Sequence, residues 1–224
     1  IPSTKKKIRY RPFLVKEEKI LIIAMESQSD TEIANAVKDV LSTCILTKDV
    51  KVDTLSTFDI EYLFLNIRGK SVGEDVEVLV TCPDDNKTKV PVRINLDDIK
   101  IITHNDHKRD IKLDDSLLMR MRYPSINEFI KSNFSTSEVK SEDTFDLIIS
   151  CIEQIYNDEE SWSTSDCTKE EMNDFLDQLN SNQFKEIEKF FDTMPKLSHT
   201  LTVNNPNTKV KSDIKLEGLA AFFA

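Results

Sequence analysis

The chain has 224 residues, enough for one large domain or two small ones. Its 30 Lys and Arg against 40 Asp and Glu give a net charge of −10, which disfavours a nucleic-acid-binding protein because phosphate attracts positive charge. It has only three glycines and three histidines, which excludes a glycine-rich phosphate loop and leaves little for a histidine-built metal or nucleophile site.

The first predicted element is a helix over residues 12–26. It opens at Pro12, and helical spacing places Ile20, Ile23 and Ala24 on one face, which we expect to be buried. No apolar run is long enough to cross a membrane, so we expect no membrane association. The apolar run here follows acidic residues instead of the basic N-terminus, an order that differs from a secretory signal and favours a cytoplasmic protein.

Two more helices are predicted before residue 70. Ser29 and Glu32 form a capping box, and the helix behind it extends to Cys44. A further helix is expected from Thr57 to Gly69, where the glycine is placed to end it.

The pattern then changes to an alternation of apolar and polar residues, which is typical of strands. Segments 76–80 and 90–96 predict a β-hairpin around a turn at 83–86. Segments 99–103 and 110–113 predict a second hairpin, whose loop contains two histidines.

The second half of the chain is predicted to be mainly helical. A strand at 117–122 precedes a short helix capped by Ser125 and Glu128, and residues 131–142 are expected to form a loop. The period of the apolar residues predicts a helix over 143–157, followed by an acidic loop with the only tryptophan.

Two helices and a hairpin complete the predicted elements. The capping box 168–171 opens the first helix, and the second covers 182–194. The hairpin has strands at 201–203 and 210–216 around a turn at 204–207. The four cysteines, widely spaced in sequence, are expected to be free thiols.

Together these elements predict an α+β fold with two β-hairpins. The hairpins share spacing, because residues 88–99 resemble residues 208–219 at an offset of 120, and each follows a helix rich in phenylalanine. A duplicated helix–hairpin unit, with both hairpins in one sheet, is one interpretation, and convergence of two turns is the other. The expected domains are 1–130 and 131–224, or one integrated domain.

Charge is distributed unevenly and suggests sites of protein binding. Residues 1–19 carry a net charge of +5 and residues 138–192 a net charge of −12, which indicates either solvated surfaces or docking surfaces. The apolar C-terminus either folds back onto the core or docks on a partner. The candidate partner-binding residues are Lys5, Lys6, Lys7, Arg9, Arg11, Phe222 and Phe223.

The residues that bear on catalysis are few. Cys82, His104 and His107 could hold zinc in a metal-dependent hydrolase, but zinc sites usually show two tight ligand pairs. Two exposed histidines in a hairpin loop are the alternative interpretation. We therefore predict no enzyme, no catalytic residue, no metal and no cofactor.

Several blocks resemble the baseplate hub proteins of T-even-type contractile-tailed bacteriophages. No single block is as specific as a catalytic motif, and the resemblance rests on their order and spacing. Some members have cysteine pairs at the first hairpin, where this chain has a single cysteine, so no metal is carried over. The blocks are Arg11-Pro-Phe13 with Lys16-Glu-Glu-Lys19, Asp59-Ile-Glu61-Tyr62 through Gly73-Glu74, Phe190-Phe191 with Met194-Pro195, His199, and Glu217-Gly-Leu219 with Phe222-Phe223.

The resemblance implies a protein that builds the hub of the tail baseplate. Members act as assembly factors (chaperones) or as hub subunits retained in the virion, and their partners are other baseplate hub proteins. The implied location is the cytoplasm of the infected bacterium or the tail baseplate of the virion. No nucleic acid or membrane partner is expected.

Overall fold

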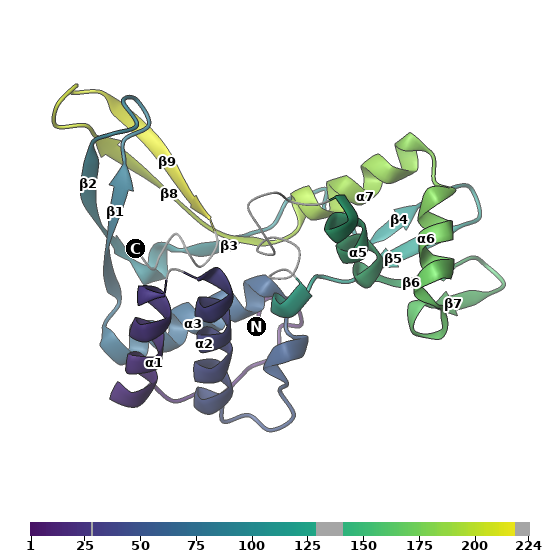
Figure 1. Ribbon diagram of the computed structural model, residues 1–224, viewed down its shortest axis with the longest axis horizontal. Coiled ribbons are helices and arrows are strands. Elements are labelled where there is room, and N and C mark those ends of the chain that lie inside the picture. Colours follow the sequence, from purple (N-terminus) through teal and green to yellow (C-terminus); the bar gives the residue numbers. More distant parts are fainter. Residues whose placement is uncertain (28, 129–140, 218–224) are drawn as a thin grey trace. The chain divides into compact units, whose positions relative to one another are not determined.

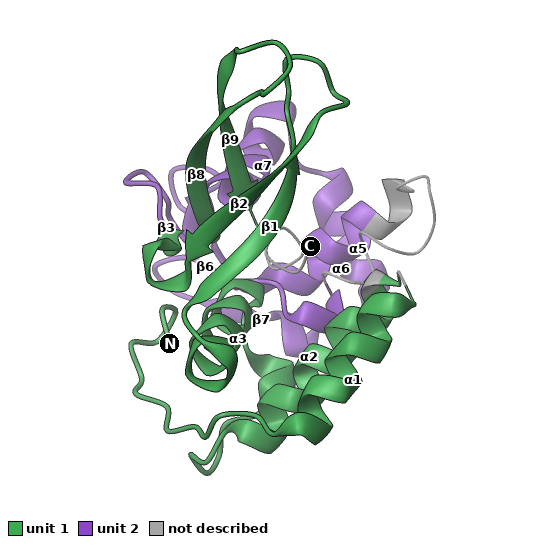
Figure 2. Cartoon of the chain, turned by 90° about the vertical axis from the view of Figure 1, so that its left-hand side faces the viewer, with its two compact units in different colours: residues 1–102, 195–224 green, residues 103–194 purple. Residues whose placement is uncertain are grey.

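A computed structural model describes residues 1–27, 29–128 and 141–217. The chain forms two compact units (Figure 2): unit 1 comprises residues 1–102 and 195–224, and unit 2 comprises residues 103–194. Unit 2 is thus an insertion within unit 1. The boundary expected from the sequence, between residues 130 and 131, falls inside unit 2 instead of between the units.

Helices and strands are both well represented, which confirms the predicted α+β class (Figure 1). The helices are α1 Val15–Glu26, α2 Asp30–Cys44, α3 Thr57–Val72, α5 Ser141–Cys151, α6 Lys169–Asp177 and α7 Ser181–Thr193. The strands are β1 Asp75–Thr81, β2 Lys89–Asn95, β3 Lys100–Ile102, β4 Asp110–Lys112, β5 Leu118–Met121, β6 Ile152–Tyr156, β7 Ser161–Ser163, β8 Lys196–Asn204 and β9 Lys211–Glu217.

Helices α1 and α2 lie side by side in unit 1. The buried face of α1 consists of Glu17, Leu21 and Ala24, whereas Ile20 and Ile23 are exposed by 44% and 65%. The predicted buried face is therefore wrong for both isoleucines. Glu17 is hydrogen-bonded to the segment before the helix. Leu21 and Ala24 lie on the same helical face as Glu17, so this contact also turns them toward the interior.

Helix α3 is the most buried helix of unit 1, with Phe58, Ile60, Phe64 and Ile67 almost inaccessible. It continues past Gly69 to Val72, so the predicted end at Gly69 is wrong. The helix ends at Gly73, whose φ of 108° is in the left-handed region that favours glycine.

The two expected hairpins are both present. Strands β1 and β2 pair in one sheet, and β8 and β9 pair in another, whose order is β3-β8-β9. The prediction that they share one sheet is wrong. Instead their apolar faces enclose a common core, and the two hairpins extend together away from the helices of unit 1 (Figure 1). The core members are Leu65, Val76, Val78, Val80, Cys82, Ile94, Leu96, Ile99, Leu197, Leu201, Val203 and Leu216.

The hairpin turns do not follow the predicted repeat. Asn86 and Lys209 have positive φ, and each donates its N–H to the carbonyl four residues earlier, in Cys82 and Asn205. Equivalent turn positions therefore lie 123 residues apart instead of 120. Moreover, α7 belongs to unit 2 while the hairpin that follows it belongs to unit 1. These two observations argue against a duplicated compact unit.

The predicted hairpin around the two histidines is also wrong. Both strands form, but β3 pairs with β8 and β4 pairs with β5. Strand β3 places Ile101 opposite Leu197, an apolar pair that closes the core of unit 1.

Unit 2 is a four-stranded antiparallel sheet, β4-β5-β6-β7, packed against helices. The predicted helix over 143–157 is half right, because α5 ends at Cys151 and the chain continues directly as β6. There Ile152 pairs with Met121 and Ile155 with Met119, so both isoleucines meet apolar partners across the sheet. Trp162 lies on β7, in the predicted acidic loop.

The capping predictions are confirmed where the structure describes them. Thr168 accepts the N–H of Glu171, whose carboxylate accepts the N–H of Thr168 in return. Ser29 accepts the N–H of Glu32 at 3.4 Å, and Ser125 and Glu128 form the expected reciprocal bonds. The predicted loop at 131–142 lies almost entirely outside the described residues. All four cysteines are free thiols.

Candidate interaction surfaces

The basic N-terminal segment is fixed to unit 1 by its backbone. Asp59, buried in the first turn of α3, accepts the backbone N–H of Ser3 at 2.9 Å and also binds the hydroxyl of that serine. Further on, the N–H of Arg9 donates to Thr47, and the N–H of Arg11 donates to the carbonyl of Cys44 at 2.9 Å. Meanwhile the side chains of Lys5, Lys6, Lys7 and Arg9 are all exposed.

Arg11 differs from these four bases. Its Nη2 donates to Glu17 at 3.0 Å, and its Nη1 donates to the carbonyl of Pro12. Glu17 is 2% exposed and also accepts the N–H of Leu14 at 2.7 Å. This network ties the entrance of α1 to the preceding segment. Arg11 therefore has an intramolecular role, although it was predicted to belong to a partner-binding run.

We expect Glu17 to make the stability of unit 1 depend on pH. The hydrogen bond from Arg11, followed by the backbone N–H of Leu14, lowers the pKa of Glu17 from 4.5 to about 2. A carboxyl whose pKa is lower in the folded state stabilises the fold above pH 4.5, and this contribution is lost as the pH falls toward 2.

The free energy of unfolding, measured with urea at a series of pH values, should therefore fall more steeply in the wild type than in Glu17→Gln over this interval. The matched control is Glu18→Gln, which changes the neighbouring carboxylate and leaves the Arg11 contact in place. Equal pH dependence in the wild type and Glu17→Gln would contradict the assignment.

The tips of the two hairpins are joined by a polar network. Asp84, in the first turn, accepts two contacts from the amide of Asn205, at 3.0 and 3.1 Å, and a short hydrogen bond from the hydroxyl of Thr208. The amide of Asn207 donates to Thr88. Asn205 is 1% exposed, and the pKa of Asp84 is lowered, first by Thr208 and then by Asn205. The network fixes one hairpin to the other far from α3.

In unit 2, His107 is held between two hydroxyl groups. Thr193 donates its own hydroxyl to the carbonyl of Lys189, so it can only accept from Nδ1 of His107, at 3.0 Å. Nε2 consequently accepts from the hydroxyl of Tyr123. The pKa of His107 is lowered mainly by burial, which disfavours the charged imidazolium. The expectation of two exposed histidines is correct for His104 and wrong for His107.

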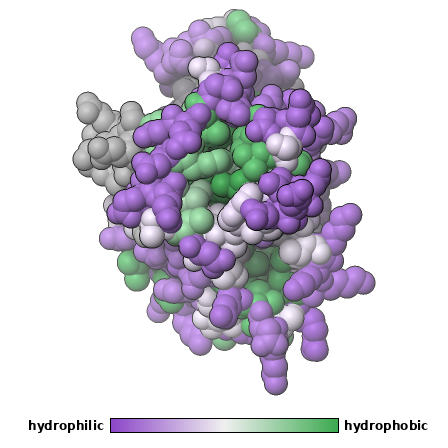
Figure 3. Space-filling model, turned by 90° about the vertical axis from the view of Figure 1, so that its right-hand side faces the viewer, coloured by the Kyte–Doolittle hydropathy of each residue, from purple (hydrophilic) through white to green (hydrophobic). Residues whose placement is uncertain are grey.

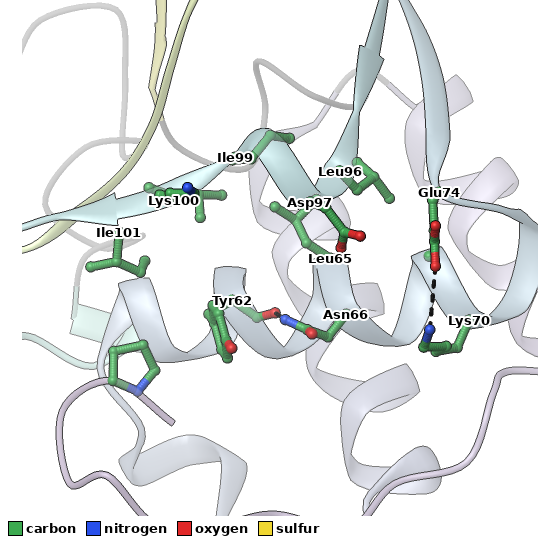
Figure 4. A pocket seen from close by; sticks show the side chains of 13 residues that line it. Tyr62, Leu65, Asn66, Lys70, Glu74, Leu96, Asp97, Ile99, Lys100 and Ile101 are labelled. Atoms are coloured by element: carbon green, nitrogen blue, oxygen red, sulfur yellow. Dashed lines mark hydrogen bonds and ion pairs between the residues drawn. The ribbon is translucent and has the colours of Figure 1, made fainter.

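A pocket of about 360 Å³ lies between α3 and the segment that leads into β3. Figure 4 shows Tyr62 and Asn66 along the helix, Ile101 above them, and an ion pair between Lys70 and Glu74 at 3.3 Å. The lining mixes apolar and polar side chains, and β3 is the edge strand of its sheet. Extended peptides can bind by adding a strand to the edge of a sheet.

The two units differ strongly in charge. Unit 1 has twenty Lys and Arg and nineteen Asp and Glu, a net charge of +1, whereas unit 2 has ten and twenty-one, a net charge of −11. Figure 3 shows one face on which hydrophobic side chains gather within a border of hydrophilic ones. Phe145 and Trp162 of unit 2 are each 43% exposed, so this acidic unit also offers aromatic side chains to a partner.

Comparison with protein families identifies the family of the chain. The family model described as T4 bacteriophage base plate protein matches residues 1–224, the full length of the chain. The chain belongs to this T4-type baseplate protein family. No curated protein and no solved structure matches it. The resemblance to T4-type phage baseplate proteins is thus confirmed.

Membership connects this protein with the phage tail baseplate and with the infected host in which baseplates are built, and it implies contacts with other baseplate proteins. Of its predicted binding residues, the exposed lysines and Arg9 lie together on unit 1, and Arg11 is engaged with Glu17. Phe222 and Phe223 lie outside the described residues. In the part of the chain that the structure describes, no helix is both long and apolar enough to cross a membrane.

The residues considered for zinc do not assemble into a site among those described. No group of three His, Cys, Asp or Glu residues in that part of the baseplate protein could hold a metal ion. Cys82 is fully buried in the hairpin core, and both ring nitrogens of His107 are hydrogen-bonded. The hydrolase hypothesis therefore gains no support from the geometry.

Proposed function

We propose that this baseplate protein is an assembly factor of the baseplate hub, which binds another hub protein and holds it in a state ready for assembly. The observation that supports the proposal is the exposed basic run Lys5–Lys7, which lies between two anchored residues: Ser3, bound to Asp59 of α3, and Arg9, whose N–H donates to Thr47. Anchoring matters because a fixed charged segment loses less conformational entropy on binding than a free one. The run fits an acidic surface on the partner.

The triple substitution of Lys5, Lys6 and Lys7 by alanine should weaken partner binding at low salt. Partner binding by this variant should also depend less on salt concentration, because the charges whose attraction salt screens are no longer present. The experiment purifies tagged full-length chain from infected cells at increasing salt concentrations, and mass spectrometry quantifies the baseplate proteins that accompany it.

The matched control replaces Lys87, Lys89 and Lys211, which are exposed lysines of the same unit, and so changes net charge equally. Recovery with this control should follow the wild type. If the Lys5–Lys7 variant recovers as much partner as the wild type at low salt, the basic run is not the binding surface.

A separate measurement distinguishes an assembly factor from a structural hub subunit. Quantitative mass spectrometry of purified particles should find the chain absent or far below the copy number of the tail proteins, although infected cells contain it. A stoichiometric copy number in the particle would instead support the structural subunit.

A further inference from the structure

The sheet β3-β8-β9 has an inner face, which closes the core of unit 1, and an outer face. Side chains alternate between the two faces along a strand, and directly paired residues share a face. Leu197 and Leu201 belong to the inner face, because both are members of the core. Ser198 therefore points to the outer face, together with its partners Lys100 on β3 and Glu217 on β9.

Ser198 is buried, unlike the next two residues of β8 on its face. Its exposed fraction is 3%, whereas Thr200 and Thr202 are exposed. Its hydroxyl has no hydrogen-bond partner among the described residues. A buried hydroxyl without a partner loses its hydrogen bonds to water and gains none, so such groups are rare in native proteins. The outer face at Ser198 therefore lacks a group that would satisfy this hydroxyl.

Apolar surface is exposed on the same face. Ile102 lies two residues after Lys100 on β3, so it shares the outer face, and its side chain is 44% exposed. Its direct partner is Lys196, whose methylene stem can lie along an apolar side chain. The face thus presents a hydroxyl that lacks a hydrogen-bond partner together with an aliphatic side chain that water reaches.

Residues 218–224 follow β9 at the position of this face. Strand β9 ends at Glu217, the direct partner of Ser198 (Figure 1). The sequence that follows is Gly-Leu-Ala-Ala-Phe-Phe-Ala, which has no charged and no polar side chain. Neighbouring strands lie about 4.8 Å apart, so β3 is about 10 Å from the end of β9, whereas seven residues span up to about 23 Å. The segment is long enough to cross the face from β9 to β3.

We propose that residues 218–224 fold back across the outer face of β8 onto β3. A backbone N–H or carbonyl of this segment forms the hydrogen bond that the Ser198 hydroxyl lacks. Phe222 and Phe223 cover Ile102 and remove apolar surface from water. Gly218 suits the change of direction after β9, since glycine adopts turn conformations at no steric cost.

The chain's own segment suits this face better than an external partner. It begins one strand away, so covering the face costs none of the translational and rotational freedom that a separate molecule would lose. Its lack of charge also matches a position that is shielded from water, where a charged segment would pay for desolvation. The contact is independent of the basic run Lys5–Lys7, and it assigns Phe222 and Phe223 to the chain's own fold instead of to a partner.

Ser198→Ala tests the hydrogen bond. If the segment supplies the partner, this substitution leaves a polar group of the segment unpaired, and the urea midpoint of unit 1 should fall. In a chain shortened to end at Glu217 the hydroxyl has no partner, so the same substitution should leave the midpoint unchanged or raise it. Hydrogen exchange of peptides from α3, measured at increasing urea, reports the unfolding of unit 1. An equal change of the midpoint in the full and the shortened chain would overturn the hydrogen bond.

Replacing Phe222 and Phe223 together by serine tests the coverage of β3. The backbone amides of β3 should exchange at least about tenfold faster in this variant, because the apolar cover is lost. The variant should fold, since the core of unit 1 is unchanged. The control Leu79→Ser changes an apolar side chain that is 51% exposed on β1, and it should leave exchange of β3 as in the wild type. Unchanged exchange of β3 in the double variant would overturn the proposal, and protection that arises only when other baseplate proteins are bound would assign the face to a partner instead.

Discussion

Replacing Phe190 with alanine should lower the free energy of unfolding of unit 2 by about 3–5 kcal/mol. Phe190 is 2% exposed on α7, and its ring lies 5.2 Å from that of His107 and 5.7 Å from that of Tyr123, centroid to centroid. Truncation removes a large buried ring and leaves a cavity beside the hydrogen-bonded histidine.

Trp162 provides the signal for this measurement. It is the only tryptophan of the chain and lies on β7, in the same unit, so its fluorescence during urea unfolding reports on unit 2. Phe191→Ala is the matched control, since its ring packs edge-on against Phe190 but is only partly buried. The control should lose clearly less stability, and an equal loss in both variants would refute the central position of Phe190.

Asp84→Ala should lower the free energy of unfolding of unit 1, because it leaves the buried amide of Asn205 without its acceptor. The two hairpin tips would then lose their connection, while the shared apolar core below them stays intact. Asp84→Asn keeps an acceptor oxygen and should cost less. We expect the order of stability to be wild type, then asparagine, then alanine.

Hydrogen exchange of the backbone amides gives the location as well as the size of this effect. Protection should fall most near the tips of β1 and β8 and least near α3. Asp84 belongs to unit 1 and Trp162 to unit 2, so the urea midpoint reported by Trp162 fluorescence should not change. If protection near the tips is unchanged in Asp84→Ala, the network does not hold the hairpins together.

The sequence predicts the local elements well, but it does not settle which face of α1 is buried. Ile20 and Ile23 fit helical spacing on one side, and Leu21 and Ala24 fit it on the other, so both faces of the helix are apolar. The hydrogen bonds of Glu17 decide between them. A buried glutamate is an improbable choice from composition alone, because acidic side chains are rarely buried without a partner.

The sequence predicts strand pairing correctly only where the pairing is local. It identifies both β-hairpins with tight turns, because turn residues and the alternation of apolar and polar residues mark them. Strand β3 finds its partner in β8, near the end of the chain, and no local pattern indicates that. In β6, Ile152 and Ile155 continue the helical period of α5, and only their pairing with β5 shows that the segment is a strand.

The candidate binding surfaces likewise divide into features that are local in sequence, which can be predicted, and contacts between distant residues, which cannot. The basic run Lys5–Lys7 is evident in the sequence and is exposed in the structure. The engagement of Arg11 with Glu17 could have been suspected from their proximity in sequence. The contact between Asp84 and Asn205 could not, because 121 residues separate them and each also fits an ordinary turn.

The insertion of unit 2 within unit 1 sets the order in which the chain can fold as it leaves the ribosome. Strands β8 and β9 are synthesised after unit 2, so the hairpin core of unit 1 cannot form until every residue of unit 2 has been made. The insertion also begins and ends at one place, because Ile102 and Lys196 are direct partners across β3 and β8. A short turn joining these two strands would therefore yield a shortened gene product that keeps the paired hairpins without the acidic unit.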